Sequence, residues 1–362
     1  MPVVSASAAS VTFLSWRRRR SLGPTPARTS SVVSMRQLQD RQRSLSNPRP
    51  TAHARGMTDN TERDVLIIGG GPAGLSGALT LSRARRTVTV VDAGEPRNAT
   101  AEHMHGFLTR DGMPPALLLE TGRTEVRGYG GEIVEGRVTR AEGGAEEGFV
   151  LTLADGTRLK GRRLLVTTGV TDVLPDIPGL QERWGREVQM CPYCHGWEVR
   201  DKKIVVLGTS PNSIHQASLV RQWSADVTFV APRAPEGEDA ARLDARGIPV
   251  VADEVKRAVV ENDRLTGLEL AGGPALPCDA VFLAPEWVAK DGPLTDLGCE
   301  TGDDGFVKVD PTGRTSVPGV WAAGNVVLPA GQVIMAAAAG AMAAAMVNAD
   351  LVEEEVARKI AT

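Results

Sequence analysis

The sequence predicts an α/β protein with two β-α-β units. Residues 64–92 have the pattern of a buried strand, a glycine-rich turn, a helix and a second strand, and residues 203–230 repeat that order. The length of 362 residues allows about two domains at roughly 150 residues each. Aromatic residues make up 4% of the chain and 39 residues are glycine, which is typical of an Ala/Gly-rich α/β protein. The length and composition exclude a chain that is disordered throughout.

Charge is distributed unevenly along the chain. Residues 1–56 contain ten arginines and one acidic residue, Asp40, whereas the remainder contains 31 basic and 43 acidic residues. The formal net charge is −3. Because a surface that binds nucleic acid needs a clear basic excess, we expect no nucleic-acid partner.

The N-terminal segment, residues 1–60, is predicted to be a disordered leader because it is rich in Ser, Arg and Pro and lacks apolar periodicity. Its short apolar stretch precedes the arginine run, the reverse of a secretory signal. It is either an organelle transit peptide or a mis-started leader before Met57, and the second reading predicts a cytoplasmic protein. The apolar run at residues 333–347 is shorter than the ~20 residues that span a bilayer, so no membrane association is expected.

The first β-α-β unit has the spacing of a dinucleotide-binding turn. Gly69 permits the tight turn, Gly71 lets backbone N–H groups approach a pyrophosphate, and Gly74 lets the helix pack closely on the strand. Asp92 ends the second strand, where a carboxylate can accept hydrogen bonds from a ribose. The predicted cofactor-binding residues of this unit are Gly69, Gly71, Pro72, Ala73, Gly74 and Asp92.

The second unit follows an apolar run at 164–168 and a proline-rich linker at 175–179. It is predicted as a strand at 203–207, a turn beginning at Gly208, a helix to about residue 223 and a strand at 226–230. Ser210 and Ser213 stand where the first unit has Gly71 and Gly74. Because serine adds bulk where a phosphate would lie, a dinucleotide is expected to bind here more weakly or differently.

The C-terminal segment contains predicted strands at 279–284 and 318–325. A helix rich in Ala and Gly then begins at Gln332 and continues to Asn348. Its small side chains let the start of the helix approach a large, flat ligand.

The sequence between the two units, Cys191-Pro-Tyr-Cys194-His195, has four interpretations. A zinc site needs four ligands, and Cys278 and Cys299 do not form a second pair. A c-type haem attachment prefers an oxidising compartment, and cysteines packed in a core rarely have this spacing. A redox dithiol is favoured, because lowering a thiol pKa from ~8.5 to ~7 increases the thiolate about 15-fold at neutral pH. The predicted catalytic residues are therefore Cys191, Cys194 and His195; no metal site is predicted, and Cys278 and Cys299 are expected to be buried thiols.

Together, the motifs GGGPAG, CPYC and TSVPGVWAAGN resemble those of low-molecular-weight thioredoxin reductase-like flavoproteins, in the pyridine nucleotide-disulfide oxidoreductase class. The resemblance covers residues 61–354. It implies an α/β fold of two doubly wound, Rossmann-like domains, the second inserted in the first. The expected division is an FAD-binding domain at 61–172 and 289–362, and a dithiol-bearing, NAD(P)H-type domain at 173–288.

The resemblance also implies residue roles. The first unit would hold the adenosine diphosphate half of FAD. Cys194 would face the flavin, and Cys191 would exchange with substrate. The implied remaining cofactor contacts are Gly324, Asn325, Gln332 and Val333 for FAD, and Gly208, Ser210, Ser213 and Arg233 for NADPH.

Three residues depart from the family pattern. Arg233 alone represents the basic residues that bind the 2′-phosphate of NADPH, and Asn325 replaces the usual Asp. His195 stands where thioredoxin reductases have an acid, and resembles instead the dithiol oxidases that close disulfides in small natural products.

The resemblance favours an FAD-dependent thiol-disulfide oxidoreductase with NADPH as electron donor. Its partner would be a thioredoxin-like protein or a small dithiol or disulfide, and the expected assembly is a homodimer. The alternative is a dithiol oxidase that passes electrons to dioxygen. A third hypothesis is a flavin-bound redox sensor without turnover.

Overall fold

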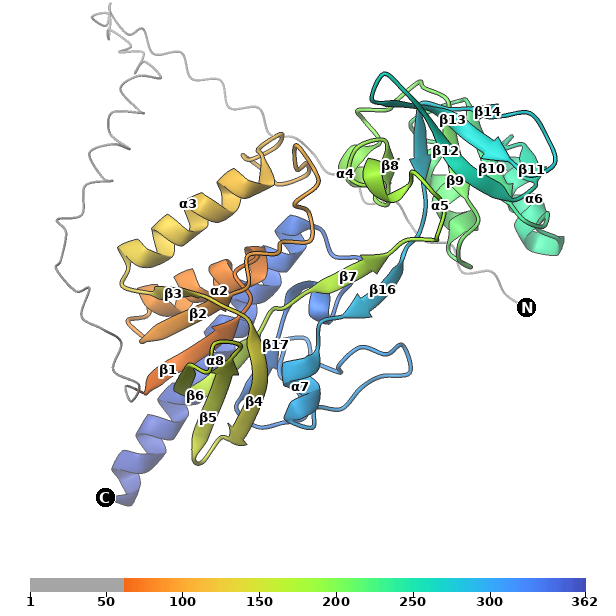
Figure 1. Ribbon diagram of the computed structural model, residues 1–362. Helices are drawn as coiled ribbons and strands as arrows, with labels where there is room; N and C mark the ends of the chain where they lie inside the picture. The colour runs from red at the N-terminus through yellow and green to blue at the C-terminus, as the bar shows by residue number, and fades with distance from the viewer. Residues whose placement is uncertain (1–61) are drawn as a thin grey trace, which may run out of the picture. The chain divides into compact units, whose positions relative to one another are not determined.

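The computed structural model describes residues 62–362, and the expectations for the leader at 1–60 lie outside this range. Two sheets that are mainly or wholly parallel dominate the fold, as expected from the two β-α-β units (Figure 1). The strands of the first sheet are β1 (Arg63–Ile68), β2 (Val88–Asp92), β3 (Glu132–Glu135), β4 (Val138–Gly144), β5 (Gly148–Leu153), β6 (Arg158–Val166) and β17 (Val320–Ala322).

The first sheet has the order β3-β2-β1-β6-β5-β4, and β17 also pairs with β6. Strands β3, β2, β1, β6 and β17 are parallel, whereas β5 and β4 add an antiparallel edge. In the register, Val65 lies opposite both Val88 and Arg163. Because β17 comes from the C-terminal part of the chain, both ends of the described chain contribute to this sheet. Its helices are α2 (Pro72–Arg83), α3 (Pro115–Gly128), α7 (Gly292–Asp296) and α8 (Val333–Ala361), with the 3-10 turn η2 (Gly324–Val326).

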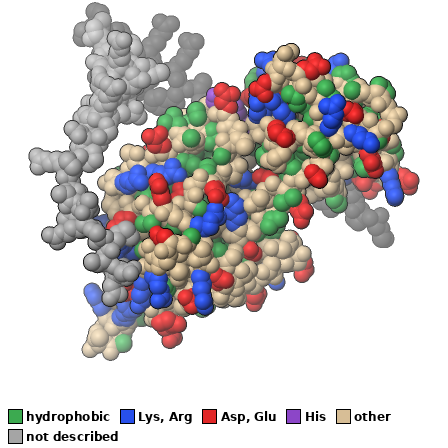
Figure 2. All heavy atoms as spheres, viewed as in Figure 1, with side chains coloured by type: hydrophobic (Ala, Val, Ile, Leu, Met, Phe, Trp, Pro, Cys, Tyr) green, Lys and Arg blue, Asp and Glu red, His purple; other side chains and the backbone are tan. Residues whose placement is uncertain are grey.

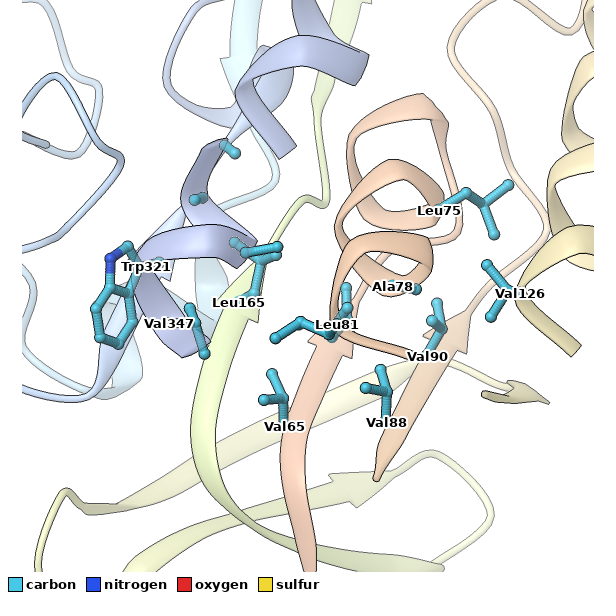
Figure 3. Close-up of a cluster of buried hydrophobic side chains, with 14 of the residues drawn as sticks. Val65, Leu75, Ala78, Leu81, Val88, Val90, Val126, Leu165, Trp321 and Val347 are labelled. Carbon is cyan, nitrogen blue, oxygen red and sulfur yellow. The ribbon is translucent and has the colours of Figure 1, made fainter. Parts of the chain in front are cut away.

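One core of this sheet lies around α2 (Figure 3). Leu75, Ala78 and Leu81 of α2 lie among buried residues of β1, β2, α3 and the C-terminal segment. Helices α2 and α8 approach closely, because a Cβ added at Gly340 would lie 2.0 Å from the carbonyl oxygen of Ala73. The small residues of both helices therefore fix the position of the α8 N-terminus above the glycine turn.

The second sheet has the order β11-β10-β9-β15-β8 and is wholly parallel. Figure 1 shows β7 and β16 side by side between the two sheets, and they pair antiparallel. The predicted domain boundaries, after residues 172 and 288, fall within these two strands and remain a proposal. The elements of this part are β7 (Val170–Val173), η1 (Gln181–Arg183), β8 (Val188–Gln189), α4 (Pro192–His195), β9 (Ile204–Leu207), α5 (Ser213–Val220), β10 (Val227–Ala231), α6 (Gly237–Ala245), β11 (Val250–Ala252), β12 (Val255–Glu261), β13 (Arg264–Leu270), β14 (Leu276–Pro277), β15 (Ala280–Phe282) and β16 (Glu286–Ala289).

The predicted end of the last helix at Asn348 was wrong, because α8 continues to Ala361. Its second half is anchored by carboxylates that pair with two arginines: Asp350 with Arg163 of β6, and Glu355 with Arg86 in the loop between α2 and β2. Leu351 is fully buried. The helix is long and apolar enough to cross a membrane by length and composition, which is weak evidence, since a core helix of a soluble protein passes the same test.

Other predicted boundaries shift by a few residues. Helix α5 ends at Val220 rather than near residue 223. The predicted strand at 318–325 contains only three strand residues, and the turn η2 follows it. In the predicted linker, the carbonyl of Pro178 accepts a hydrogen bond from the N–H of Ala258 at the second sheet's flank. Figure 2 shows acidic and basic side chains interspersed over the visible face of the described residues.

Candidate active site

One cleft of about 440 Å³ brings most of the predicted site residues together, a volume in the usual range for ligand sites. It extends from the β1–α2 turn to the dithiol and the start of α8. The predicted residues that line it are Gly69, Gly71, Pro72, Ala73, Asp92, Cys191, Cys194, His195, Asn325, Gln332 and Val333. Gly74 is buried and Gly324 lines a smaller groove, while Gly208, Ser210, Ser213 and Arg233 belong to the β9–α5 and β10–α6 connections.

The glycine turn fits a dinucleotide. Gly69 has a φ of 106°, and a Cβ at Gly74 would lie 1.9 Å from the carbonyl oxygen of Gly69. Both positions therefore require glycine for the backbone itself. A Cβ at Gly71, by contrast, would meet no atom within 4 Å. Because Gly71 also lines the cleft, its missing side chain leaves space for a ligand, as a pyrophosphate at this helix N-terminus would need.

Asp92 lies at the end of β2, as predicted, and is already paired. Its Oδ2 accepts a hydrogen bond of 2.7 Å from Arg123, and its Oδ1 accepts one of 3.1 Å from the N–H of Gly94. A Cβ added at Gly70 would lie 2.3 Å from Asp92 Oδ2, so only glycine at this position leaves room for the Asp92 carboxylate beside the turn. Arg123 and Gly70, which the sequence motif did not single out, therefore fix the orientation of Asp92 in the cleft.

Cys191 and Cys194 form a disulfide that lines the cleft. Cys191 is the N-cap of the short helix α4, and its Sγ accepts a hydrogen bond of 3.2 Å from the N–H of Cys194. Gln332 precedes α8 and places its Nε2 3.4 Å from Cys194 Sγ and 4.0 Å from Cys191 Sγ. The amide donor of Gln332 can therefore stabilise a thiolate at Cys194.

Asn325 shapes the loop before α8. Its Nδ2 donates to the carbonyls of Leu328 at 2.9 Å and of Gly331 at 2.8 Å. The side-chain amide that was expected near the cofactor is therefore committed to the loop that positions Gln332.

His195 faces a second histidine that the sequence did not identify. The His105 and His195 ring centroids are 6.3 Å apart and the ring planes are nearly perpendicular. His105 Nδ1 lies 3.4 Å from Asp111, and its Nε2 lies 3.5 Å from Glu198. Burial lowers the pKa of His195, an effect that Glu198 opposes and His105 reinforces. The His105 segment carries no recognisable motif, so only the folded chain reveals the pair.

Arg97 is another cleft residue without a sequence motif. It pairs with the buried carboxylate of Asp172 at 2.5 Å and donates to the carbonyl of Pro329 at 2.6 Å. Its Nη2 also lies 3.6 Å from Met190 Sδ, directly before the dithiol. Arg97 thus connects the loop after β2 with β7, the dithiol segment and the loop before α8.

The turn after β9 is bonded to its own side chains. Ser213 is fully buried, and its Oγ accepts hydrogen bonds of 3.1 Å from the N–H groups of both Thr209 and Ser210. The Thr209 hydroxyl donates to the carbonyl of Ala284, at 2.9 Å, and so bridges the crevice between the ends of β9 and β15. Two of the backbone N–H groups that could bind a pyrophosphate are therefore already bonded within the chain.

The remaining cysteines are buried thiols, as predicted. Burial raises the pKa of Cys278 to about 12 and raises the pKa of Cys299 as well. Within residues 62–362, no group of three or more His, Cys, Asp or Glu side chains is arranged to hold a metal ion.

Known proteins resemble this chain in both sequence and fold. The family profile "Pyridine nucleotide-disulphide oxidoreductase" matches residues 63–345. The thioredoxin reductase sirT of Leptosphaeria maculans is 32% identical over 79% of this chain and 93% of its own. The crystal structure of HlmI covers 84% of this chain and 97% of its own, at 50% identity and a TM-score of 0.81. A putative thioredoxin reductase of Bacillus anthracis is 30% identical over 80% of this chain and 99% of its own, with a TM-score of 0.76.

These similarities confirm the expected two-domain Rossmann fold and the oxidoreductase activity class. Proteins of the matching family bind FAD and use NADPH, the two cofactors that the sequence predicted. In this chain the first glycine turn fits FAD, and the turn after β9 has two of its backbone N–H groups bonded to the Ser213 hydroxyl. The chain belongs to the pyridine nucleotide-disulphide oxidoreductases and is a thioredoxin reductase-like enzyme.

Proposed function

We propose that this chain is an FAD-dependent dithiol oxidase, which converts a small dithiol to its disulfide and passes the electrons to dioxygen. From the sequence alone, an NADPH-dependent disulfide reductase was slightly favoured over the dithiol oxidase. The observation that favours the oxidase instead is the turn after β9, where the Ser213 hydroxyl accepts hydrogen bonds from two backbone N–H groups. Electrons then enter through the Cys191–Cys194 disulfide, which lies in the same cleft as the first glycine turn.

The hydrogen bonds of the β9–α5 turn support the proposal directly. NADPH binding there would require displacing the Ser213 hydroxyl from two backbone N–H groups. It would also leave Ser213 without those donors in a fully buried position. Leaving a buried polar group unsatisfied costs about 1–3 kcal/mol, which opposes cofactor binding at this turn.

The charges after β10 point the same way. Arg233 is exposed and is the only basic residue between β10 and the first turn of α6. Glu236, Glu238 and Asp239 follow within six residues. A 2′-phosphate at this position would meet more negative than positive charge, which disfavours its binding.

The dithiol can accept electrons by two thiol-disulfide exchanges. A substrate thiolate attacks Cys191 Sγ, so that a substrate–Cys191 bond forms, the Cys191–Cys194 bond breaks and Cys194 leaves as a thiolate near Gln332. The second substrate thiolate then attacks the substrate sulfur of the mixed disulfide. This attack forms the product disulfide and releases Cys191 as the second thiol, so the substrate is oxidised and the dithiol is reduced.

His195 is placed to accept the proton of an incoming thiol. Because burial lowers its pKa, the imidazole is neutral, and so able to act as a base, at a lower pH than an exposed histidine. FAD, when bound in the cleft, supplies a two-electron acceptor that dioxygen reoxidises, so one dithiol and one dioxygen give one disulfide and one hydrogen peroxide.

Disulfide reduction with NADPH is the second candidate. It is favoured by the similarity to thioredoxin reductases such as that of Listeria monocytogenes, which is 27% identical over 73% of this chain. Among such relatives thioredoxin-like partners and homodimers are common, and a homodimer with a cytoplasmic location remains our proposal for this chain.

Anaerobic mixing of the FAD-loaded protein separates the candidates. Dithiothreitol should bleach the flavin within seconds, NADPH should not, and air should restore the colour with one hydrogen peroxide formed per dithiol. A Cys191→Ser and Cys194→Ser double variant controls for direct reduction of the flavin by dithiothreitol. Rapid bleaching by NADPH would overturn the oxidase in favour of the reductase. Failure of every dithiol to support turnover would favour a redox sensor.

A further inference from the structure

The loop between β2 and α3 supplies a second histidine to the dithiol region. His105 lies in this loop, 90 residues before His195, and its ring meets the His195 ring edge-on at a centroid distance of 6.3 Å. Both residues line the cleft that contains the disulfide. Both histidines are partly exposed, and about one-fifth of the His105 side chain is accessible.

His105 is itself held by two carboxylates on opposite ring nitrogens. Nδ1 lies 3.4 Å from Asp111 Oδ1, within the same loop, and Nε2 lies 3.5 Å from Glu198 Oε1, just after α4. Asp111 is fixed by a hydrogen bond of 2.9 Å from the N–H of Gly106, which lowers the pKa of the Asp111 carboxyl. Glu198 is three residues beyond His195, so His105 connects the loop to the dithiol segment.

His195 has no comparable support. Among residues 62–362, no side chain or backbone group hydrogen-bonds its ring, and the charged or titratable groups that act on it are Glu198 and His105. An imidazole without hydrogen-bond partners can exchange a proton with a reacting thiol, but its orientation is then set by packing contacts alone. The edge contact with His105, which is held by two carboxylates, is such a contact.

We propose that His105 is a positioning residue for thiol exchange: held by Asp111 and Glu198, it fixes the orientation of the His195 ring next to the dithiol segment. The proton that a substrate thiol gives up moves to His195, and no electrons move in this step. The proposal rests on the proposed function only for the direction of exchange, because the same proton movement accompanies reduction or oxidation of the disulfide.

The test measures exchange at the disulfide without turnover. The full chain is mixed anaerobically with dithiothreitol, quenched with an alkylating reagent, and analysed for reduced Cys191 and Cys194 by mass spectrometry between pH 5.5 and 8.5. Since general acid–base groups contribute about 10²–10⁴-fold, we expect His195→Gln to slow exchange about 100-fold and His105→Gln and His105→Phe about tenfold. His215→Gln, an exposed histidine of α5, is the matched control and should exchange like the wild type.

The pH profiles separate proton transfer from packing. Exchange should slow as the pH falls through the pKa of His195. Because His105 lowers that pKa and Glu198 raises it, the acidic limb should move to higher pH in the His105 variants and to lower pH in Glu198→Gln. In a His195→Gln background, His105→Gln should have no further effect.

Two results would overturn the proposal. One is a wild-type rate and pH profile in both His105 variants; the other is a full wild-type rate in His105→Phe alone, which would show that the contacts of His105 with Asp111 and Glu198 do not contribute. A failure of the oxidase proposal looks different, because dioxygen consumption would then be absent while exchange at the disulfide still depended on His105.

Discussion

Gln332 Nε2 lies 3.4 Å from Cys194 Sγ, although the two residues are 138 positions apart. Gln332 is the N-cap of α8, whose position is set by the contact of Gly340 with the backbone of Ala73. The helix that packs on the glycine turn therefore also carries the donor that reaches the dithiol. Cofactor turn and redox centre are held in one arrangement by the small residues of α2 and α8.

Gly71→Ala should weaken FAD binding without unfolding the protein. The added methyl meets no protein atom within 4 Å but enters the cleft where the pyrophosphate is expected. We expect FAD affinity to fall at least tenfold, about 1.4 kcal/mol, with little change in the unfolding temperature of the cofactor-free protein. Flavin absorbance in a titration measures the affinity. Gly128→Ala on α3, also in open space, is the control, and equal affinity in the two variants would contradict the assignment of the turn.

Single cysteine variants should identify the sulfur that exchanges with substrate. In Cys194→Ser, Cys191 remains where the N–H of residue 194 can stabilise its thiolate, at 3.2 Å in the present structure. We expect this variant to form a mixed disulfide with glutathione disulfide about tenfold faster than Cys191→Ser, in keeping with the larger thiolate fraction of a stabilised cysteine. Intact-protein mass spectrometry follows the adduct. Faster reaction of Cys191→Ser would exchange the roles assigned to the two cysteines.

Removing the charge of Arg97 should destabilise the protein strongly. Asp172 has a side chain that is only 7% exposed, so Arg97→Met would leave its carboxylate buried without a partner. Such changes cost about 3–5 kcal/mol in the free energy of unfolding, measurable by urea denaturation. Arg140→Met breaks an exposed pair with Glu142 and should cost less than about 1 kcal/mol. Adding Asp172→Asn to Arg97→Met should restore part of the lost free energy of unfolding, because it removes the unpaired carboxylate. If stability did not recover, the loss in Arg97→Met would not come from the buried charge of Asp172.

Glu355 should stabilise the fold in a pH-dependent way. Hydrogen bonds from Arg86 and then Arg162 lower the pKa of Glu355 to about 2. Because a glutamate in the unfolded chain titrates near ~4.3, the stabilisation is complete above that pH and is lost as the pH falls toward 2. The melting temperature of Glu355→Gln should therefore lie below that of the wild type at pH 6, and the difference should shrink toward pH 2. Glu353→Gln, exposed on the same helix, should show no such trend; a difference independent of pH would disprove the electrostatic origin.

The glycine spacing, the Cys-x-x-Cys pair and the order of strands were readable from the sequence because they are local patterns. Gly69 and Gly74 are required by backbone contacts within a few residues, and Cys191 and Cys194 are joined across one short helix. The end of α8 could not be predicted, because the sequence does not show that Asp350 and Glu355 pair with Arg163 of β6 and Arg86 of the α2–β2 loop.

The sequence by itself thus determined the family, the FAD-type turn and the identity of the dithiol, because each depends on residue types at fixed short spacings. The tertiary structure decided that Ser213 occupies the donors of the second turn and that His105 meets His195. The histidine contact joins segments far apart in the chain, and the serine contact depends on where one hydroxyl points. Neither leaves a signature in the order of amino acids, because long-range packing and side-chain direction are set only when the chain folds.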